Sequence, residues 1–459
     1  MGQAGTIRRI SVVGLGKLGA PIVAVLAAKG YEVVGIDLVA ATVEKIAAGV
    51  ATVEEPGLQE MLSANKARIS ATTDWSKAVG DTDFTYIIVP TPSGHDGAFK
   101  NDHLLAVMDE IGKVLAKKPG YHLVAVNSTT MPGSMDGPIK ARLERASGRK
   151  VGPDMGLCYN PEFIALGDVI NGLLHPDFVL IGECDKRAGD LLVSIYRRVV
   201  GDKASIARMN FVNAELVKLS INTYVTTKIS FANMLSEICD RYEGADVDVV
   251  TGALGHDTRI GKKYLRGATG YGGPCFPRDT VAFATMARQA GASADLASAT
   301  DVVNARQLAR LRDLVCECTP AGKRVAVLGL AYKVDTPVIE RSQGVALAAA
   351  LAESGFAVIV HDPLALDPAR SMLGEAVEYA STAELAVAGA ATAVLMTAWP
   401  HYKALTPESF RGVSRPVIID CWRMLDRNRF EGRVELLYLG RHKPAKSAHK
   451  RFRMRTDCH

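Results

Sequence analysis

The stretch Ile10-Ser11-Val12-Val13-Gly14-Leu15-Gly16-Lys17-Leu18-Gly19 joins a β-branched run to three glycines spaced G-x-G-x-x-G, and a helical stretch from Ala20 to Lys29 follows it. The first glycine permits a tight turn, the second lets the backbone approach a pyrophosphate, and the third allows close packing of helix on strand. The helix then points the positive end of its dipole at the phosphates. The stretch therefore predicts a strand–turn–helix unit that binds a dinucleotide through Gly14, Gly16, Lys17, Leu18 and Gly19.

A carboxylate, Asp37, follows the next β-branched run, Glu32–Ile36. It stands 23 residues after Gly14. Such a carboxylate accepts hydrogen bonds from the ribose hydroxyls and repels a 2′-phosphate, which favours NAD over NADP as the cofactor. A turn that binds another nucleotide, or none, is the alternative. Two further segments, Pro90-Thr91 and Ser128-Thr129, follow strands of the same sheet and are expected at its ligand-binding edge.

The runs of apolar, β-branched residues continue along the chain and alternate with Ala-rich helical segments, which predicts βαβ units and parallel sheets. The runs are Ile10–Val13, Glu32–Ile36, Phe84–Val89, Leu123–Val126 and Phe178–Ile181, then, after a helical stretch from about Asn213 to Ala305, Arg324–Leu328, Ala357–Val360, Thr392–Met396 and Val417–Ile419. Val327-Leu328-Gly329-Leu330-Ala331 echoes Val12–Gly16. We expect an α/β fold of two Rossmann-like, doubly wound parallel-sheet domains joined by a central helical segment.

The expected boundaries are 1–205 for the NAD-binding domain, 206–318 for the central helical domain, 319–440 for the second α/β domain, and 441–459 for a basic, disordered tail. The helical domain is expected to form a homodimer or a higher homo-oligomer. The 459 residues include 54 basic and 49 acidic ones, a balance that argues against nucleic acid as the main partner. No apolar run is long enough for a membrane span, and eight cysteines without regular spacing do not form a disulfide framework. A reducing cytoplasm and the absence of a metal site are expected.

A second glycine-rich stretch, Gly270-Tyr271-Gly272-Gly273-Pro274-Cys275-Phe276-Pro277-Arg278-Asp279, presents a thiol directly after three glycines. A cysteine beside an arginine and at a helix start can act as a nucleophile. From these residues alone, a buried structural cysteine is equally compatible with the pattern.

This stretch resembles the active-site signature of the UDP-glucose/GDP-mannose dehydrogenase family, and the resemblance extends over about residues 8 to 430. It implies that Cys275 holds the sugar C6 as a thiohemiacetal and then a thioester. Asn160-Pro161-Glu162-Phe163 resembles the segment whose glutamate assists hydrolysis of the thioester. Lys218 and Asn222, four positions apart on one helical face, resemble the family's lysine and asparagine.

The resemblance also assigns roles to residues without a local signal. Thr129 and Asp279 would arrange a water and the lysine, and Arg278 would contribute to the cofactor site. The implied catalytic set is therefore Cys275, Lys218, Asn222, Asp279, Glu162 and Thr129. The implied substrate-binding set is Phe163, Ile164, Lys218, Asn222, Arg259, Tyr264, Leu265, Tyr271, Gly272, Lys333 and Arg341, with Arg259 reaching across a dimer. Taken singly, Lys218 or Arg259 also fits a solvated surface residue, and Glu162 fits a turn cap.

Four positions depart from the family pattern. Leu166 stands where many members have a second glutamate, Asn127 where a lysine is often seen, Arg278 where a lysine is common, and Glu340-Arg341 reverses the usual order. The resemblance implies an NAD-dependent nucleotide-sugar 6-dehydrogenase, with UDP-glucose as the best guess for its substrate. UDP-N-acetylhexosamine or GDP-mannose as the substrate, a single-hydride hydroxyacid dehydrogenase and a non-catalytic nucleotide-binding scaffold are the alternatives.

Overall fold

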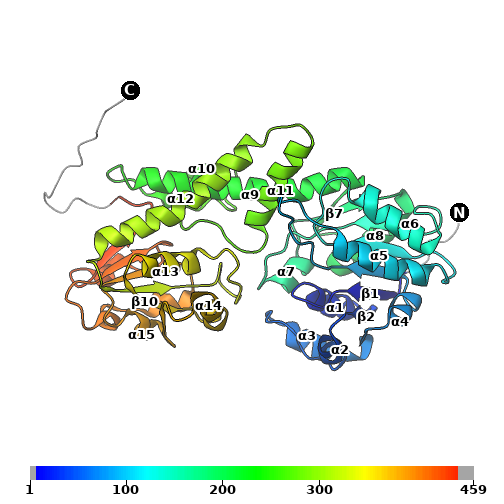
Figure 1. The fold of residues 1–459 in the computed structure, drawn as a ribbon, viewed down its shortest axis with the longest axis horizontal. Coiled ribbons are helices and arrows are strands. Elements are labelled where there is room, and N and C mark those ends of the chain that lie inside the picture. Colours follow the sequence, from blue (N-terminus) through cyan, green and yellow to red (C-terminus); the bar gives the residue numbers. More distant parts are fainter. Residues whose placement is uncertain (1–6, 443–459) are drawn as a thin grey trace. The chain divides into compact units, whose positions relative to one another are not determined.

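The structure is a computed structural model that describes residues 7–442, and it divides into two compact units (Figure 1). Unit 1 comprises the chain up to Tyr224 together with Cys275–Ser298, and unit 2 comprises Val225–Pro274 together with the chain from Ala299. Two of the three divisions fall inside the long helices α9 (Phe211–Cys239) and α12 (Asp295–Cys318), and the third falls between Pro274 and Cys275. The predicted domain boundaries stay predictions, and most of the predicted basic tail lies outside the described residues.

Unit 1 contains an eight-stranded sheet of order β3-β2-β1-β4-β5-β6-β7-β8. Its strands are β1 (Arg9–Val13), β2 (Glu32–Ile36), β3 (Ile69–Thr72), β4 (Phe84–Ile87), β5 (Leu123–Val126), β6 (Gly156–Tyr159), β7 (Phe178–Glu183) and β8 (Ser205–Met209). Its helices are α1 (Gly19–Ala28), α2 (Ala40–Ala47), α3 (Leu58–Ala64), α4 (Trp75–Gly80), α5 (Asp102–Leu115), α6 (Lys140–Ser147), α7 (Val169–Leu174), α8 (Lys186–Val200), the first part of α9, and α11 (Phe276–Gln289).

The two faces of this sheet bury separate cores because successive side chains of a strand point to opposite faces. Ile10 and Val12 of β1 pack in one core with residues of α1, α7 and α8. Val13 packs in the other core with residues of α5 and α6. The strands are therefore covered on both sides, which explains their continuous apolar runs.

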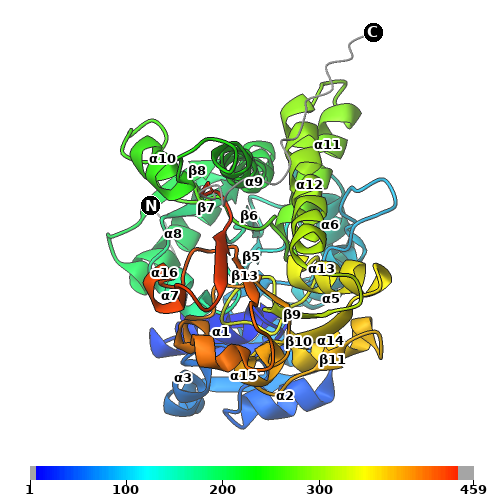
Figure 2. The same ribbon diagram turned by 90° about the vertical axis from the view of Figure 1, so that its left-hand side faces the viewer.

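Unit 2 contains a six-stranded parallel sheet of order β11-β10-β9-β12-β13-β14. Its strands are β9 (Arg324–Leu328), β10 (Ala357–His361), β11 (Glu378–Tyr379), β12 (Thr392–Leu395), β13 (Val417–Asp420) and β14 (Glu435–Tyr438). Its helices are α10 (Val247–Leu254), α13 (Gln343–Glu353), α14 (Leu366–Leu373), α15 (Ala383–Val387), α16 (Arg427–Phe430) and the remaining parts of α9 and α12. Val325 and Val327 pack with α13, whereas Ala326 and Leu328 pack with α15, so that β9 and β10 lie between these helices (Figure 2).

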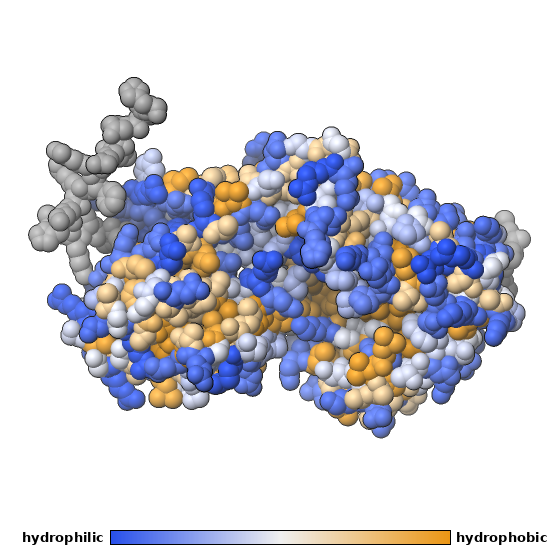
Figure 3. Space-filling model, in the orientation of Figure 1, coloured by the Kyte–Doolittle hydropathy of each residue, from blue (hydrophilic) through white to orange (hydrophobic). Residues whose placement is uncertain are grey.

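The predicted fold class is confirmed: two α/β domains with parallel sheets accompany a helical segment. Two strands of the first sheet, β7 and β8, run opposite to the other six, because β7 is antiparallel to β6 and β8 is parallel to β7. No helix of residues 7–442 is long and apolar enough to cross a membrane. Hydrophobic residues are interspersed with hydrophilic ones on the face drawn in Figure 3.

Candidate active site

The turn after β1 has glycine at three positions, and the physical reason differs from one position to the next. Gly14 has a φ of +92°, and a Cβ atom there would lie 2.3 Å from the Ile88 carbonyl oxygen. A Cβ atom on Gly19 would lie 1.7 Å from the Gly14 carbonyl oxygen, so that only glycine allows α1 to pack on the turn. A Cβ atom on Gly16 would meet nothing within 4 Å. The space beside Gly16 is therefore open, and a phosphate group can approach the backbone there; we call this space the cradle.

The groups around this cradle suit a dinucleotide with free ribose hydroxyls. Helix α1 has no capping side chain at Leu18, so its first backbone N–H groups face the cradle without a side-chain acceptor. Asp37 is half-buried, and its two oxygens accept one hydrogen bond each, from the backbone N–H of Leu15 at 2.8 Å and of Val39 at 2.9 Å. Because a carboxylate oxygen accepts two hydrogen bonds, Asp37 retains capacity for ribose hydroxyls. The donor set therefore fits NAD.

The carboxyl ends of β4 and β5 are tied together beside this turn. The Ser128 hydroxyl donates to the Val89 carbonyl oxygen at 2.6 Å, and the Val89 N–H donates back to the Ser128 hydroxyl at 3.0 Å. The Thr91 hydroxyl donates to the Thr129 carbonyl oxygen at 2.8 Å. The predicted cofactor segments Pro90-Thr91 and Ser128-Thr129 thus form one connected edge.

Cys275 lies at the N-cap position of α11, is exposed and is not part of a disulfide. The alternative of a buried structural cysteine is therefore wrong for this residue. The helix start favours negative charge at that position. Arg278, one turn into α11, donates to the Thr91 carbonyl oxygen at 3.1 Å and lies over the ring of Phe99 at 4.5 Å. Arg278 thereby connects the helix of Cys275 to the cofactor edge.

Helix α9 contributes two further polar groups to the same unit. The Asn222 amide donates to Asp279 Oδ2 at 2.6 Å, and the Asp279 N–H donates to the Cys275 carbonyl oxygen at 2.8 Å. The other oxygen of Asp279 is buried without a hydrogen-bond partner, 3.7 Å from Arg278 Nε. The structure therefore brings Asn222 and Asp279 together one helical turn from Cys275.

Lys218 and Glu162 form a second group of predicted catalytic residues. Lys218 is buried, which contradicts the alternative of a solvated lysine, and its ammonium donates to the Glu162 carbonyl oxygen at 2.5 Å. Burial raises the pKa of Glu162, and the Lys218 charge acts in the opposite direction. The Lys218 ammonium also lies 4.8 Å above the ring of Phe163. A carboxylate with a raised pKa beside a fixed cation is suited to general base catalysis.

The segment that follows Glu162 accounts for one departure from the family pattern. The ring of Phe163 stacks on Phe178 at 5.1 Å. Ile164 and Leu166 pack against the core that contains α1 and α7. Leu166 is therefore anchored in apolar surroundings, where an ionised glutamate would be costly.

Sequence reasoning missed Glu215, whose carboxylate joins α9 to the segment that follows Ser128-Thr129. Its fully buried carboxylate accepts hydrogen bonds from the Thr130 hydroxyl at 3.1 Å and from the backbone N–H groups of Gly133 and Met135 at 2.7 and 2.9 Å. Burial raises the pKa of this carboxyl group. Glu215 precedes Lys218 and Asn222 by three and seven residues, the spacing of one helical face, and this pattern could have identified it.

Unit 2 contains several of the substrate-binding residues that the resemblance implies. Some lie in two loops that pack together, whereas Arg259 is exposed. A Cβ atom on Gly272 would lie 2.3 Å from the Arg341 carbonyl oxygen, so the glycine loop and the loop that carries Lys333 and Arg341 are packed together. The Tyr271 hydroxyl donates to Asp301 at 2.6 Å and is buried. Arg259 is 86% exposed at its side chain and pairs with Asp257 at 2.6 Å, and this exposure also fits the solvated alternative.

Two residues close to Arg259 differ in exposure. Tyr264 is half-exposed with a φ of +62°, whereas the neighbouring Leu265 is buried. Within residues 7–442, no group of three or more His, Cys, Asp or Glu side chains is arranged to hold a metal ion.

Comparison with known proteins shows which family the chain resembles in sequence and structure. Residues 8–200, 212–306 and 326–427 match the NAD binding, central and UDP binding domains of the UDP-glucose/GDP-mannose dehydrogenase family. The chain is 35% identical over 422 residues to UDP-glucose 6-dehydrogenase AglM of Haloferax volcanii, covering 91% of this chain and 97% of that protein. It is 34% identical to GDP-mannose 6-dehydrogenase of Pseudomonas syringae, over 77% of this chain and 80% of that protein. A UDP-glucose dehydrogenase structure from Pyrobaculum islandicum superposes with a TM-score of 0.87 at 32% identity, covering 96% of this chain and 100% of that one.

Proposed function

The chain belongs to the UDP-glucose/GDP-mannose dehydrogenase family, and from this premise we propose that it oxidises the C6 alcohol of a nucleotide sugar to the carboxylate through covalent attachment to Cys275. The observation that carries the proposal is the exposed Cys275 thiol at the start of α11, one turn before the Asp279 carboxylate to which Asn222 donates. Oxidation of a primary alcohol to a carboxylate removes four electrons. A covalent attachment retains the reactive aldehyde between the two oxidations.

Bound NAD supplies a hydride acceptor for each of the two oxidations, so that two NAD molecules are consumed per sugar. Cys275 adds its sulfur to the aldehyde carbon, and the thiol proton passes to the carbonyl oxygen. Lys218 and Asn222 stabilise the negative charge that develops on that oxygen. After the second oxidation, a water attacks the thioester carbon, Glu162 takes the water proton, and the carbon–sulfur bond breaks to release the Cys275 thiolate. Thr129 and Asp279 orient the water and the lysine.

UDP-glucose is the proposed substrate, because the UDP-glucose 6-dehydrogenase of H. volcanii matches nearly the full length of both chains and the UDP-glucose dehydrogenase of P. islandicum does the same in structure. GDP-mannose is the second candidate, supported by the 34% identity to a GDP-mannose 6-dehydrogenase. UDP-N-acetylhexosamine is a third candidate for the same chemistry. The packing of Gly272 on Arg341 joins two segments that the resemblance assigns to the sugar nucleotide.

The test is the amount of NADH formed per sugar nucleotide consumed. UDP-glucose, GDP-mannose, UDP-N-acetylglucosamine and UDP-N-acetylmannosamine are supplied in parallel, and we expect two NADH per UDP-glucose. A yield of two NADH with another sugar would replace the substrate and keep the reaction. The absence of NADH with all four would remove the proposal in favour of a non-catalytic nucleotide-binding protein.

A cysteine pair tests the covalent step. Cys275→Ser should abolish the second oxidation, whereas Cys316→Ser, which also removes an exposed thiol, should leave turnover unchanged. Mass spectrometry of the acid-quenched parent enzyme should find a sugar-nucleotide adduct on Cys275. Full activity of Cys275→Ser would point instead to a single-hydride hydroxyacid dehydrogenase.

We further propose a homodimer formed through α9. On this helix Phe231, Met234 and Ile238, spaced three and four residues apart, are 46%, 36% and 42% exposed. An apolar row of this kind indicates a covered surface, and a second copy of the chain is the occupant that the resemblance implies. Light scattering should give twice the chain mass for the parent and for Leu385→Glu on α15, and the mass of one chain for Ile238→Glu.

A further inference from the structure

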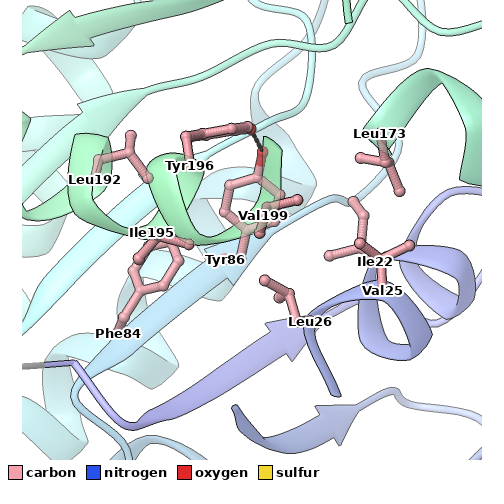
Figure 4. A pocket seen from close by; sticks show the side chains of 10 residues that line it. All are labelled: Ile22, Val25, Leu26, Phe84, Tyr86, Leu173, Leu192, Ile195, Tyr196 and Val199. Carbon is pink, nitrogen blue, oxygen red and sulfur yellow. Dashed lines mark hydrogen bonds between the residues drawn. The ribbon is translucent and has the colours of Figure 1, made fainter. Parts of the chain in front are cut away.

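Two buried tyrosine hydroxyls converge on one oxygen of Glu162. The Tyr196 hydroxyl lies 2.9 Å and the Tyr86 hydroxyl 3.2 Å from Glu162 Oε1. The two hydroxyls lie 3.1 Å apart, and the dashed line in Figure 4 marks this contact. Tyr86 comes from β4 and Tyr196 from α8, so two separate elements contribute a donor to the same carboxylate. Neither tyrosine carries a sequence motif, and the reaction described above does not use them.

Two asparagines also form hydrogen bonds with the tyrosine hydroxyls. Asn160 Oδ1 lies 2.6 Å from each hydroxyl, and its amide orientation is fixed because Asn160 Nδ2 donates to the Leu180 carbonyl oxygen at 2.8 Å. Asn127 Nδ2 donates to the Tyr86 oxygen at 2.9 Å. Each hydroxyl thus has two side-chain acceptors within reach, Asn160 Oδ1 and Glu162 Oε1, and Tyr196 is the closer of the two donors to Glu162.

The surroundings of the two hydroxyls show that this network ends there. Both tyrosine rings line a cavity of about 30 Å³ whose remaining lining residues are apolar: Ile22, Val25, Leu26, Phe84, Leu173, Leu192, Ile195 and Val199 (Figure 4). A proton that reached the hydroxyls would find no further acceptor in this cavity. The tyrosines are therefore placed to hold Glu162, not to conduct a proton away from it.

The second oxygen of Glu162 differs from the first. Among the described residues, no side chain or backbone group donates a hydrogen bond to Oε2, whereas Oε1 accepts from the tyrosines. The charged or titratable groups that face the carboxyl are Tyr86, Tyr196 and Lys218. Oε2 is consequently the oxygen that can receive a proton.

We propose that Tyr86 and Tyr196 are positioning residues that hold Glu162 by Oε1, so that Oε2 accepts the proton of the water that hydrolyses the thioester. The inference rests on the proposed function. In the step, the water oxygen bonds to the thioester carbon, one water proton moves to Oε2, and the carbon–sulfur bond breaks with its electron pair on the Cys275 sulfur. No electron acceptor is needed. The two hydroxyls also offset the burial that raises the pKa of Glu162.

The experiment compares Tyr196→Phe, Tyr86→Phe and the double variant with the parent. Tyr402→Phe is the matched control, because Tyr402 is also a fully buried tyrosine whose hydroxyl has hydrogen-bond partners, and its ring lies in unit 2. An infrared pH titration follows the carboxyl band of Glu162, identified by its loss in Glu162→Gln. Without the donor of Tyr196, the pKa of Glu162 should rise by about one unit.

The second readout is the pH dependence of steady-state turnover with the sugar nucleotide that the parent oxidises. The acid limb of kcat should move upward by about one pH unit in Tyr196→Phe, with KM unchanged and activity restored at higher pH. The thioester on Cys275 should accumulate at low pH in this variant. The control should change neither limb, although it loses a buried hydroxyl.

The outcomes are separable. An unmoved Glu162 titration in correctly folded Tyr196→Phe and Tyr86→Phe overturns the positioning role, whatever the activity. A moved titration with an unmoved acid limb overturns it as well, because Glu162 would then not limit hydrolysis. A moved titration in a protein that forms no Cys275 adduct with any nucleotide sugar removes the proposed function, and the inference with it.

Discussion

The turns after β1 and β9 share one backbone design and differ in what they leave open. Gly14 and Gly329 both have positive φ, at +92° and +102°, and each N–H donates at 2.8 Å to the last residue of the neighbouring strand. A Cβ atom on Gly344 would lie 2.0 Å from the Gly329 carbonyl oxygen, as one on Gly19 would approach Gly14. Both turns therefore bring a helix equally close to a strand.

The acidic residues that follow the second strand of each domain show the difference. Asp37 accepts two backbone hydrogen bonds and is half-buried. Asp362 is fully buried and accepts five, from the backbone N–H groups of Leu330, Ala331, Leu364 and Ala365 and from the Trp399 indole. The first carboxylate can still bind a ligand, whereas the second is saturated by the protein. The same motif position serves binding in one domain and stability in the other.

The helices that follow the two turns differ in the same sense. Leu18 gives α1 no side-chain cap, whereas the Ser342 hydroxyl accepts from the N–H groups of Gly344 and Val345 at the start of α13. A ligand phosphate can therefore satisfy α1, while α13 is satisfied by its own chain. Two turns with the same backbone can therefore differ in ligand binding. The turn that can bind a ligand is the one whose carboxylate can accept further hydrogen bonds and whose helix N–H groups lack a side-chain cap within the protein.

The largest effect is expected from substitutions that prevent the close approach of helix and turn, a feature that both turns share. Gly19→Ala and Gly344→Ala should each destabilise their unit by at least about 3 kcal/mol in chemical denaturation, because the added methyl group meets a carbonyl oxygen. Only Gly19→Ala should also abolish NAD binding, measured by calorimetry in the fraction that folds. Equal loss of NAD binding in both variants would contradict the division of roles.

The second prediction exchanges one atom in each acidic residue. Asp362→Asn should cost about 3 kcal/mol of stability, because an amide nitrogen replaces an acceptor that faces buried donors. Asp37→Asn should leave stability nearly unchanged, weaken NAD binding about tenfold and reduce the preference over NADP. Titration of both variants with both cofactors checks the pair, and a stability loss in Asp37→Asn as large as in Asp362→Asn would refute it.

The sequence predicted the binding turn better than the sealed one, and local information explains why. The glycine spacing and Asp37 lie within one βαβ unit, so the pattern alone specified their neighbours. The saturation of Asp362 depends on Trp399, which is 37 residues away, and the partners of Glu162 come from Tyr86 and Tyr196, 76 and 34 residues away. Such contacts between distant segments leave no periodic signal.

The same reasoning applies to the strands. The central strands β1, β4, β5, β9 and β12 were predicted because apolar, β-branched and aromatic residues dominate them. The strands β3, β6, β8, β11 and β14 were not predicted. β11 has two residues, β3 and β8 contain polar residues, and β6 starts at Gly156 and holds a cysteine. Their place in the sheets depends on neighbours that a local pattern does not contain.

The third prediction concerns a methyl group placed in the open space beside Gly16. Gly16→Ala should keep the parent's stability, because the new methyl group meets no atom within 4 Å. NAD binding should nevertheless weaken by at least about tenfold, since the methyl group occupies the space that a phosphate requires. The corresponding position in unit 2 is already Ala331, so Ala331→Gly should create no second NAD site. Calorimetry that finds a second NAD site in Ala331→Gly would show that the turn, and not its satisfied groups, limits binding.

The smallest expected effect concerns the cap of α13. Ser342→Ala should lower stability by about 1 kcal/mol, because it removes the acceptor for the N–H groups of Gly344 and Val345 and the donor to the Leu330 carbonyl oxygen. NAD affinity should stay at the parent value, because Ser342 caps α13 and not α1.

The matched variant is Leu18→Ser, which offers α1 a side-chain acceptor. If an internal cap competes with a ligand phosphate, this variant should gain stability in the absence of NAD and lose NAD affinity. Unchanged NAD affinity in Leu18→Ser would show that the uncapped helix start does not contribute to cofactor binding.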